Sequence, residues 1–466
     1  MPNSTFTLRS PMPVSAEELY AWHARPLAFQ RLQPPWERAR VVNQEGTFGT
    51  DGHRVTIRTK TLGPVHTTWL AEAFDFQPGR RFQDRALKGP FAHWNHTHLM
   101  IPDGDRAAHL EDHIEYRVPL GVPGRLFAGR MVRRRLARMF AYRHFITASD
   151  LRRHAQFAHQ PRLTVAVTGS RGSVGADLVP FLTTAGHKVI RLVTGNATPP
   201  YDDGTHWVSW KPTEPLDPKT FDGVDAVIHL AGDNVAEGRW NDAKKKKILD
   251  SRTIPTGHIA RAVAAVPAER RPKVFVCASA VGAYGSRGDE LLTEDAATGT
   301  GFFPDVVRAW EAACDPARAA GVRTINLRIG VVLSLAGGAL AKQLLPFKMG
   351  LGAVLGTGKQ WVPWITANDV VGAIEHALHT TGLHGPVNAV APHPVTNREF
   401  TKTLGRVLRR PAFFWLPRFA LRQMFGAIAD DALLASMNAL PAKLLTNGYE
   451  FDHADLEPAL RFLLGR

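Results

Sequence analysis

The chain has 466 residues, of which 44% are hydrophobic and 21% charged, with two cysteines and a formal net charge of +15. This length suits two to four domains, and the near-average composition excludes collagen, coiled coil and wholesale disorder. Cys277 and Cys314 are too few for a disulfide framework and lack metal-site spacing, which favours a reducing compartment. The sequence has no apolar signal segment and no continuous apolar run of 18 residues. We therefore expect a cytoplasmic protein without a membrane span.

Residues 1–155 predict an α+β domain. One early helix precedes runs of alternating polar and apolar residues, separated by Gly, Pro and Asp turns, at 53–63, 66–76, 97–103 and 108–120. A basic segment follows at 123–145, and its apolar residues recur at helical spacing. We expect an antiparallel sheet closed by this long helix. Its positive charge is either a solvated helix face, which the spacing favours, or a patch for nucleic acid or an anionic membrane. No nucleic-acid partner is expected.

Residues 163–384 predict an α/β doubly wound domain. Apolar strands alternate with helical segments, and the strands are expected at 163–169, 188–193, 225–232, 273–280 and 324–333. Continuously apolar strands are typical of a parallel sheet covered by helices on both faces. The remainder, 385–466, predicts a small C-terminal domain with a strand at 386–391, a helix at 396–410 and an apolar helical tail.

A glycine-rich loop lies between the first of these strands and its helix. It reads Thr168-Gly169-Ser170-Arg171-Gly172-Ser173-Val174-Gly175. In this position glycines permit a tight turn and close backbone approach, and the helix N-terminus binds a pyrophosphate. The loop therefore predicts a dinucleotide site.

The spacing TGxxGxxG resembles that of the extended short-chain dehydrogenase/reductases. The segments LAGDNVAEGRW, CASAVGAYG, PFKMGLGAVLGTGKQWVPWI and RPAFFWLP resemble an atypical branch of the epimerase family, NAD-dependent nucleoside-diphosphate-sugar epimerases with a C-terminal domain of unknown function. WHARPLAFQRLQPPW and GPFAHWNHTH resemble an SRPBCC (START-like, polyketide cyclase/dehydrase) domain fused to such proteins. The resemblance implies a Rossmann domain that binds NADP or NAD. It also implies an N-terminal helix-grip domain whose cavity takes an apolar ligand.

The resemblance assigns the cofactor contacts. Gly169, Gly172 and Gly175 would contact the dinucleotide together with Thr168, Ser173 and Val174, and the segment Leu230, Ala231 and Gly232 would line its adenosine side. An acidic residue after the second strand would hold the ribose diol of NAD, and none is present at 193–195. Arg171 either reaches a 2′-phosphate or is a solvated turn residue. We favour NADP over NAD.

The catalytic pair departs from the family pattern. Ser279 matches the catalytic serine, and a Tyr-x-x-x-Lys pair is expected beyond it, in which the lysine lowers the pKa of the tyrosine for acid–base chemistry. Phe303 and Val307 stand at those two positions. Tyr284, the nearest phenol in sequence, is either structural, which we favour, or a relocated acid. The chain is therefore either an NAD(P)-dependent epimerase or oxidoreductase with an unknown small-molecule substrate, or a non-catalytic dinucleotide sensor or assembly factor.

Three further groups have two interpretations each. Lys244–Lys247, Arg239 and Arg252 either face an anionic substrate or form a solvated helix face. Trp361, Trp364 and Asp369 begin the substrate lobe, where the tryptophans serve packing first and a ligand wall second. His93, His96 and His98 suggest a metal, with His96 and His98 on one strand face. Because no carboxylate stands at a fixed spacing, we expect no metal, and favour a polar cavity mouth or an exposed strand face.

Overall fold

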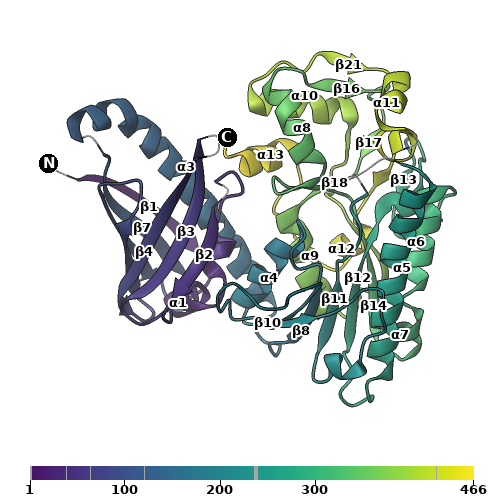
Figure 1. Cartoon of the computed structure of the whole chain (residues 1–466), viewed down its shortest axis with the longest axis horizontal. Helices are drawn as coiled ribbons and strands as arrows, with labels where there is room; N and C mark the ends of the chain where they lie inside the picture. The colour runs from purple at the N-terminus through teal and green to yellow at the C-terminus, as the bar shows by residue number, and fades with distance from the viewer. Residues whose placement is uncertain (1–2, 38, 63–64, 120, 236–239, 427) are drawn as a thin grey trace.

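The computed structural model describes residues 3–37, 39–62, 65–119, 121–235, 240–426 and 428–466. The N-terminal lobe stands beside a larger lobe, and helix α3 runs between its own sheet and that larger lobe (Figure 1). The N-terminal sheet is antiparallel with strand order β1-β7-β6-β5-β4-β3-β2. Its elements are β1 (Ser4–Met12), α1 (Ala16–Ala24), α2 (Ala28–Arg31), β2 (Arg40–Glu45), β3 (His53–Leu62), β4 (Val65–Gln77), β5 (Arg81–Lys88), β6 (His93–Pro102), β7 (Ala108–Arg117) and α3 (Gly121–Gln156).

Alternation along the strands sets the inner face of this sheet. In β7 every second residue from Ala108 to Tyr116 is buried, as the period of two requires. Leu136 and Phe140 of α3 pack on Trp94 and Ile114 of this face. The predicted α+β arrangement is therefore present, although β1, β2 and β5 were not predicted.

Helix α3 is longer than the basic pattern predicts, because it continues from 145 to Gln156. The extension buries Thr147, Asp150 and His154, so contacts with the rest of the protein stabilise this part of the helix. Arg133 and Arg134, in the preceding part, are exposed. In the part of the basic segment whose side chains the structure describes, α3 thus has a solvated face, as the helical spacing of its apolar residues predicts.

The larger lobe contains a seven-stranded parallel sheet of order β10-β9-β8-β11-β12-β14-β19, which confirms the predicted Rossmann-like arrangement. α4 and α9 pack on one face, and α5, α6 and α7 on the other. The strands are β8 (Thr164–Thr168), β9 (Lys188–Val193), β10 (His206–Ser209), β11 (Ala226–His229), β12 (Val274–Ala280), β14 (Arg323–Ile329) and β19 (Gly385–Ala389). The helices are α4 (Gly175–Thr184), α5 (Asp242–Ala265), α6 (Phe302–Ala312), α7 (Asp315–Ala319) and α9 (Ala367–His379).

One strand lies outside its predicted domain. β19, assigned from sequence to the C-terminal part, pairs with β14 and completes the parallel sheet. Val387, Asn388 and Ala389 are all buried, so both faces of β19 are covered, as is typical of a strand in a parallel sheet. The parallel sheet thus extends to Ala389 rather than ending before 385.

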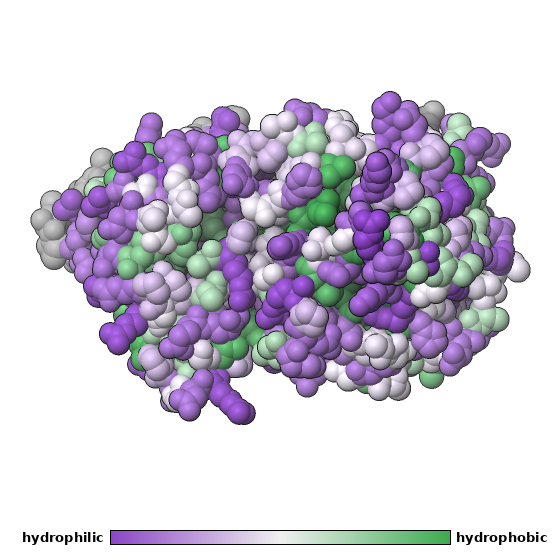
Figure 2. All heavy atoms as spheres, turned by 90° about the horizontal axis from the view of Figure 1, so that it is seen from below, coloured by the Kyte–Doolittle hydropathy of each residue, from purple (hydrophilic) through white to green (hydrophobic). Residues whose placement is uncertain are grey.

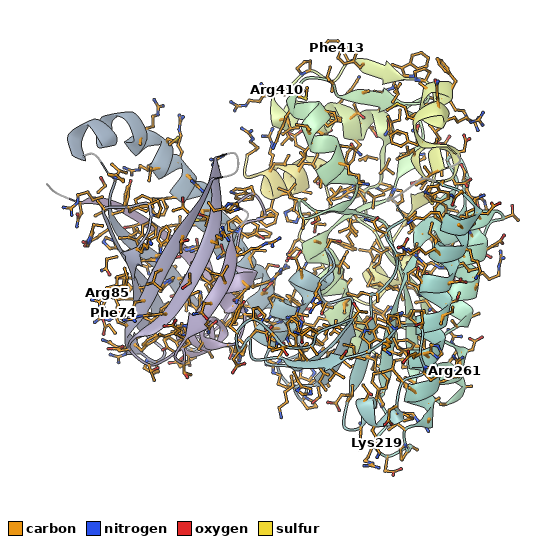
Figure 3. The ribbon with its side chains drawn as sticks, in the orientation of Figure 1. Phe74, Arg85, Lys219, Arg261, Arg410 and Phe413 are labelled. Atoms are coloured by element: carbon orange, nitrogen blue, oxygen red, sulfur yellow. The ribbon has the colours of Figure 1, made fainter. Side chains whose placement is uncertain are left out.

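The smaller elements form a cap above the carboxyl side of the sheet (Figure 1). The predicted helical tail at 411–429 is wrong in part, because β21 precedes a short helix, α11. Phe413 projects at the far end of this cap (Figure 3) and is 74% exposed. The elements are β13 (Leu291–Leu292), β15 (Val331–Leu333), α8 (Gly338–Lys348), β16 (Ala353–Leu355), β17 (Trp361–Val362), β18 (Trp364–Thr366), β20 (Val395–Thr396), α10 (Asn397–Leu408), β21 (Phe414–Leu416), α11 (Arg418–Phe425), β22 (Asn438–Ala439), α12 (Ala442–Thr446) and α13 (Leu456–Leu464).

Buried ion pairs join the two lobes. Arg153 of α3 lies 2.9 Å from an Asp369 oxygen and 2.8 Å from an Asp452 oxygen. Arg31 pairs with Asp150 of its own lobe at 2.7 Å, with both side chains almost completely buried, and also donates to Asn368 Oδ1 of the larger lobe. Such pairs hold the lobes in one orientation, since separating either partner would leave a buried charge uncompensated.

Seen from below, the surface is mostly hydrophilic with hydrophobic patches between polar residues (Figure 2). Among the residues that the structure describes, no helix combines the length and apolar character needed to cross a membrane.

Candidate dinucleotide site

The glycine-rich loop turns from β8 into α4 at a point where side chains have no room. Gly169 has a φ of +69°, and a Cβ there would lie 2.7 Å from the carbonyl carbon of Leu230. A Cβ on Gly175 would lie 2.2 Å from the carbonyl oxygen of Gly169. The loop therefore packs directly on the backbone of the Leu230–Ala231 segment and leads into the N-terminus of α4, where backbone amides favour an anion.

Thr168 connects the two strand ends beside this loop. Its Oγ1 accepts hydrogen bonds from the amides of Leu230 and Ala231 at 3.2 and 3.3 Å, and contacts His229 Nδ1 at 2.7 Å. Because burial lowers the pKa of His229 to about 3, that imidazole is neutral at pH 7. Sequence reasoning missed His229, whose only signal is a polar residue at the end of an apolar strand.

β8 is the strand at which the order of the sheet reverses. It pairs with β9 on one side and with β11 on the other. In open parallel sheets the crevice outside the carboxyl ends at such a point is where ligands bind. The loop at 168–175 and the segment 230–232 flank this crevice, so the predicted cofactor residues come together. These residues have the tight backbone packing that a bound dinucleotide requires.

Two arginines contact one indole ring at the edge of the loop. The guanidinium groups of Arg191 and Arg171 lie 4.3 and 5.1 Å from the centre of the Trp207 ring. Arg191 pairs with Asp203 at 2.8 Å and donates to Ser170 Oγ at 3.3 Å. Arg171 is exposed and donates to the carbonyl oxygen of Asn196. Arg191 and Trp207 had no motif to identify them.

Ser279, at the end of β12, belongs to a polar group of three side chains. Its hydroxyl donates to Glu311 Oε1 at 2.6 Å. Arg328 donates from Nε and Nη2 to the two oxygens of Glu311, at 2.8 and 2.9 Å. Burial alone would lower the pKa of Arg328, but the hydrogen bonds and charge of Glu311 raise it above its ordinary value. The carboxylate is thus fixed by a bidentate pair and directed at the serine.

The expected tyrosine–lysine pair is replaced by packing residues. Phe303 lies beside Gly282 and contacts Trp240 with ring centroids 5.5 Å apart, and Val307 is buried in the core. Tyr284 is completely buried and its hydroxyl donates to Asn388 Oδ1 at 2.8 Å, while burial raises its pKa. These contacts fit the structural interpretation of Tyr284.

Comparisons with known proteins agree with this geometry. A family model described as the NAD dependent epimerase/dehydratase family matches residues 165–390, and one for a domain of unknown function, DUF1731, matches residues 416–463. The epimerase family protein Mb2239 of Mycobacterium bovis is 39% identical over 302 residues, which are 65% of this chain and 98% of that protein. The chain belongs to the epimerase family.

Two solved structures extend the comparison. The nucleoside-diphosphate sugar epimerase of Corynebacterium glutamicum is 32% identical with a TM-score of 0.79, covering 99% of this chain and 90% of that one. Human epimerase family protein SDR39U1, solved with NADPH, is 32% identical with a TM-score of 0.57, covering 65% of this chain and 99% of that one. The first likeness includes the N-terminal lobe of this epimerase-family protein.

The remaining predicted side chains serve mainly as supports in the epimerase-family chain. Lys244 and Lys247 pair with Asp233, and Arg252 donates to the Asp233 carbonyl oxygen while packing on Trp310 at 5.1 Å. Arg239 lies outside the described residues.

The residues predicted to begin the substrate lobe also form internal contacts. Trp364 is buried, and Trp361 donates to Asp289 at 2.8 Å. Asp369 pairs with Arg153 between the lobes, so it is not available to a substrate.

The N-terminal lobe encloses a cavity of about 1220 Å³ that aromatic and aliphatic residues line, including Phe48, Ile57 and Trp69. His96 and His98 also line it, so an exposed strand face is the wrong interpretation of these histidines. Although burial opposes it, the charges of Asp84 and Asp112 raise the pKa of His96 to about 9. Asp203 and Gly204 of the larger lobe contribute to the cavity wall.

Proposed function

We propose that this epimerase-family protein binds NADP(H) in the crevice between β8 and β11. Gly169, Gly172, Gly175 and the N-terminus of α4 would face the pyrophosphate, and Leu230–Gly232 the adenosine. The observation that carries the choice of NADP is Arg171, an exposed cation held against Trp207 at the edge of the loop. No carboxylate follows β9 at 193–195 to hold a ribose diol. The NADPH in the human relative supports this choice.

We further propose a reaction of oxidoreductase or epimerase type on an unknown small molecule, with Ser279 and Glu311 at the reacting centre. The nicotinamide supplies hydride chemistry when bound. Arg328 donates to both oxygens of Glu311, and Glu311 accepts the hydroxyl hydrogen of Ser279. The serine oxygen can therefore accept a hydrogen bond from a substrate hydroxyl, and Glu311 is the acceptor for a proton passed through it.

The alternative is a dinucleotide-binding sensor or assembly factor without turnover. Phe303 and Val307 favour it, since neither side chain can exchange a proton. It predicts NADPH binding with neither oxidation of the cofactor by carbonyl compounds nor epimerisation of any nucleotide sugar.

We assign residues 1–155 to an SRPBCC-like domain whose cavity takes an apolar ligand. The aromatic lining and the volume support this, since small-molecule sites are concave, mostly apolar and of this order of size. The Rossmann domain would follow at 163–384 with β19 added, and the rest of 385–466 would be the small C-terminal domain.

Titration with NADPH and NADH, followed by protein fluorescence, tests the central proposal. NADPH should bind at least about tenfold more tightly than NADH, and Arg171→Ala should remove most of this difference. Gly172→Asp should abolish binding of both, because its carboxylate would face the pyrophosphate. Arg261→Ala, which changes an exposed arginine far from the loop (Figure 3), is the matched control. Unchanged affinity in Gly172→Asp would refute the site.

Turnover separates the two forms of the proposal. Consumption of NADPH with a carbonyl substrate, or epimerisation of a nucleotide sugar without net loss of cofactor, supports the enzyme if it is lost in Glu311→Gln with NADPH affinity retained. Tight binding without turnover in the wild-type protein supports the sensor.

A further inference from the structure

Four polar side chains from three neighbouring strands meet on the inner face of the N-terminal sheet. Asp84 comes from β5, His96 and His98 from β6, and Asp112 from β7. The pairing register places Asp84 opposite His96 and Asp112 opposite His98. All four point to one side of the sheet, toward α3, because they alternate with residues that point outward.

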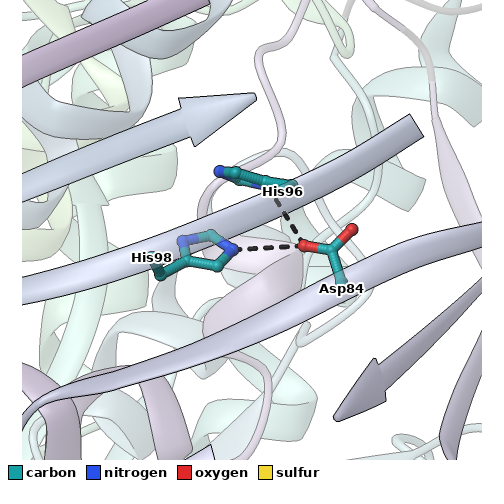
Figure 4. Close-up of side chains that lie close together, drawn as sticks. All are labelled: Asp84, His96 and His98. Carbon is teal, nitrogen blue, oxygen red and sulfur yellow. Dashed lines mark hydrogen bonds and ion pairs between the residues drawn. The ribbon is translucent and has the colours of Figure 1, made fainter. Parts of the chain in front are cut away.

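The atoms facing Asp84 are spaced as ligands of one ion. Asp84 Oδ2 lies 3.1 Å from His96 Nδ1 and 3.2 Å from His98 Nε2, as the dashed lines in Figure 4 mark. Ligand atoms about 2.1 Å from a tetrahedral or octahedral divalent ion are themselves about 3.0–3.4 Å apart. Both Asp84 distances fall in this range, and one ligand atom of each of the three residues lies within 4.8 Å of the other two, so one cation could contact all three side chains after they draw together.

The opposite nitrogens of the two histidines face Asp112. His96 Nε2 donates to Asp112 Oδ1 at 2.9 Å, and His98 Nδ1 lies 2.7 Å from the same oxygen, although out of line for a hydrogen bond. The other oxygen of Asp112 accepts from His144 Nε2 at 2.7 Å. A carboxylate that takes the second N–H of a histidine fixes the ring and leaves its other nitrogen free for a metal.

The site is both buried and open to the cavity. His96 and Asp112 are each 2% exposed, so a charged Asp112 needs a positive charge beside it, which either a protonated His96 or a bound cation can supply. Asp84, His96 and His98 nevertheless belong to the cavity wall. An ion held by three protein ligands here would keep its remaining coordination positions toward the cavity.

We propose that Asp84, His96 and His98 bind a borderline divalent cation such as Zn²⁺ or Fe²⁺ in the N-terminal cavity, with Asp112 as a positioning residue. Two imidazoles and one carboxylate suit such ions better than Mg²⁺ or Ca²⁺, which prefer oxygen ligands. The open positions would take an oxygen atom of the molecule that occupies the cavity. This inference stands apart from the dinucleotide site.

A second cluster, His187, Glu375 and His379, does not support the same inference. His187 Nδ1 accepts the amide hydrogen of Leu163 at 2.9 Å, so the proton of the neutral ring is on Nε2. A metal at that nitrogen would require an imidazolate. In His98, Nε2 donates to Asp84 and Nδ1 makes no hydrogen bond, so the ring can hold its proton on Nδ1 and leave Nε2 to a metal. In His96, Asp112 accepts the Nε2 proton, so Nδ1 can be left to the metal.

Metal binding to the full-length, untagged and chelator-stripped protein tests the proposal. Zn²⁺ is titrated in competition with a chromophoric chelator, so that weak binding to surface histidines does not register. We expect one equivalent of Zn²⁺ per chain, with affinity reduced about 100-fold or more in His98→Gln and in Asp84→Asn. Asp112→Asn should reduce affinity about 10–100-fold without changing the stoichiometry.

His93→Ala is the matched control, because His93 lies on the same strand but faces away from the cluster. It should leave Zn²⁺ affinity unchanged. Near-ultraviolet circular dichroism and NADPH affinity identify variants that fail to fold. If those variants are unfolded, Co²⁺ is added to the wild-type protein instead. Ligand-field absorption typical of nitrogen and oxygen ligands supports the site, and its absence shows that there is no site. Absence of a competitive Zn²⁺ site, or equal affinity in folded His98→Gln and wild type, would overturn the proposal.

Discussion

The guanidinium of Arg191 packs on the indole ring of Trp207 at 4.3 Å, in a position that no motif indicated. Asp203 neutralises Arg191, whereas Arg171 contacts the same ring and donates to a backbone carbonyl oxygen. Trp207 thus orders two cations at the edge of the glycine loop. In the proposed NADP complex, Arg171 is the cation that would meet the 2′-phosphate.

Replacing Trp207 should change the preference for NADPH over NADH more than it changes the affinity for NADH. Trp207→Ala removes cation–π contacts worth about 0.5–2 kcal/mol, so we expect NADPH affinity to fall about 3–10-fold while NADH affinity changes little. Trp207→Phe, which keeps an aromatic face, should lie between wild type and Trp207→Ala. Fluorescence titration with both cofactors measures this, and a parallel loss for NADH would contradict it.

The stability of the loop should depend on pH through His229. Its folded pKa of about 3 lies below the ordinary value of 6.5, so the unfolded state binds more protons between these limits. The contribution of His229 to the free energy of unfolding is fully present above about pH 6.5. It is lost as the pH falls from 6.5 toward 3, at roughly 1.4 kcal/mol per pH unit.

His229→Gln should flatten this dependence by roughly that slope, since glutamine does not titrate. Hydrogen exchange of the β8 and β11 amides between pH 7 and 5, corrected for intrinsic rates, measures it locally. His113→Gln, on the N-terminal lobe, is the control. Equal slopes in wild type and His229→Gln would show that His229 is not the group responsible.

Glu311 should matter for stability as well as for chemistry. Glu311→Gln leaves the guanidinium of Arg328, whose side chain is 5% exposed, without its carboxylate. Because Glu311 keeps some solvent contact, we expect a loss of about 2–3 kcal/mol in the free energy of unfolding, somewhat below the cost of breaking a fully buried pair. Ser279→Ala should cost about 1 kcal/mol. Urea denaturation compares the two, and the reverse ranking would contradict the arrangement.

The pair between Arg31 and Asp150 should be among the costliest to break. Arg31→Met leaves a completely buried carboxylate unpaired, with an expected loss of about 3–5 kcal/mol. Arg135→Met breaks a pair with Glu37 at an exposed arginine and should cost less than about 1 kcal/mol. Thermal unfolding of the two variants under one set of conditions measures the difference. Similar melting temperatures would argue against a structural role for the buried pair.

Sequence patterns identified the elements whose neighbours are close in the chain. The loop at Gly169–Gly175 follows its strand directly, so periodicity and glycine spacing located it without tertiary information. The parallel, doubly wound character of the sheet, though not its strand order, follows from the same alternation of apolar strands and helices. β19 was misplaced because a buried strand after a long insertion has no local signal for the sheet that it joins.

Side chains brought together across strands could not be predicted in this way. His96 and His98 lacked a carboxylate at any fixed spacing, because their acidic neighbours, Asp84 and Asp112, come from β5 and β7. Glu311 is likewise 32 residues from Ser279 in sequence. Strand register and helix packing set these distances, and neither can be deduced from one sequence.

The last helix also constrains the order of events during synthesis. Phe462 of α13 stacks on Tyr142 with ring centroids 4.9 Å apart, and Arg138 donates to the carbonyl oxygen of Gly465. Helix α3 therefore completes its packing only after α13 has been synthesised. Until then Tyr142 and Phe145 lack the Phe462 ring that covers them, and exposed apolar surface of this kind is what makes partly folded chains prone to aggregate.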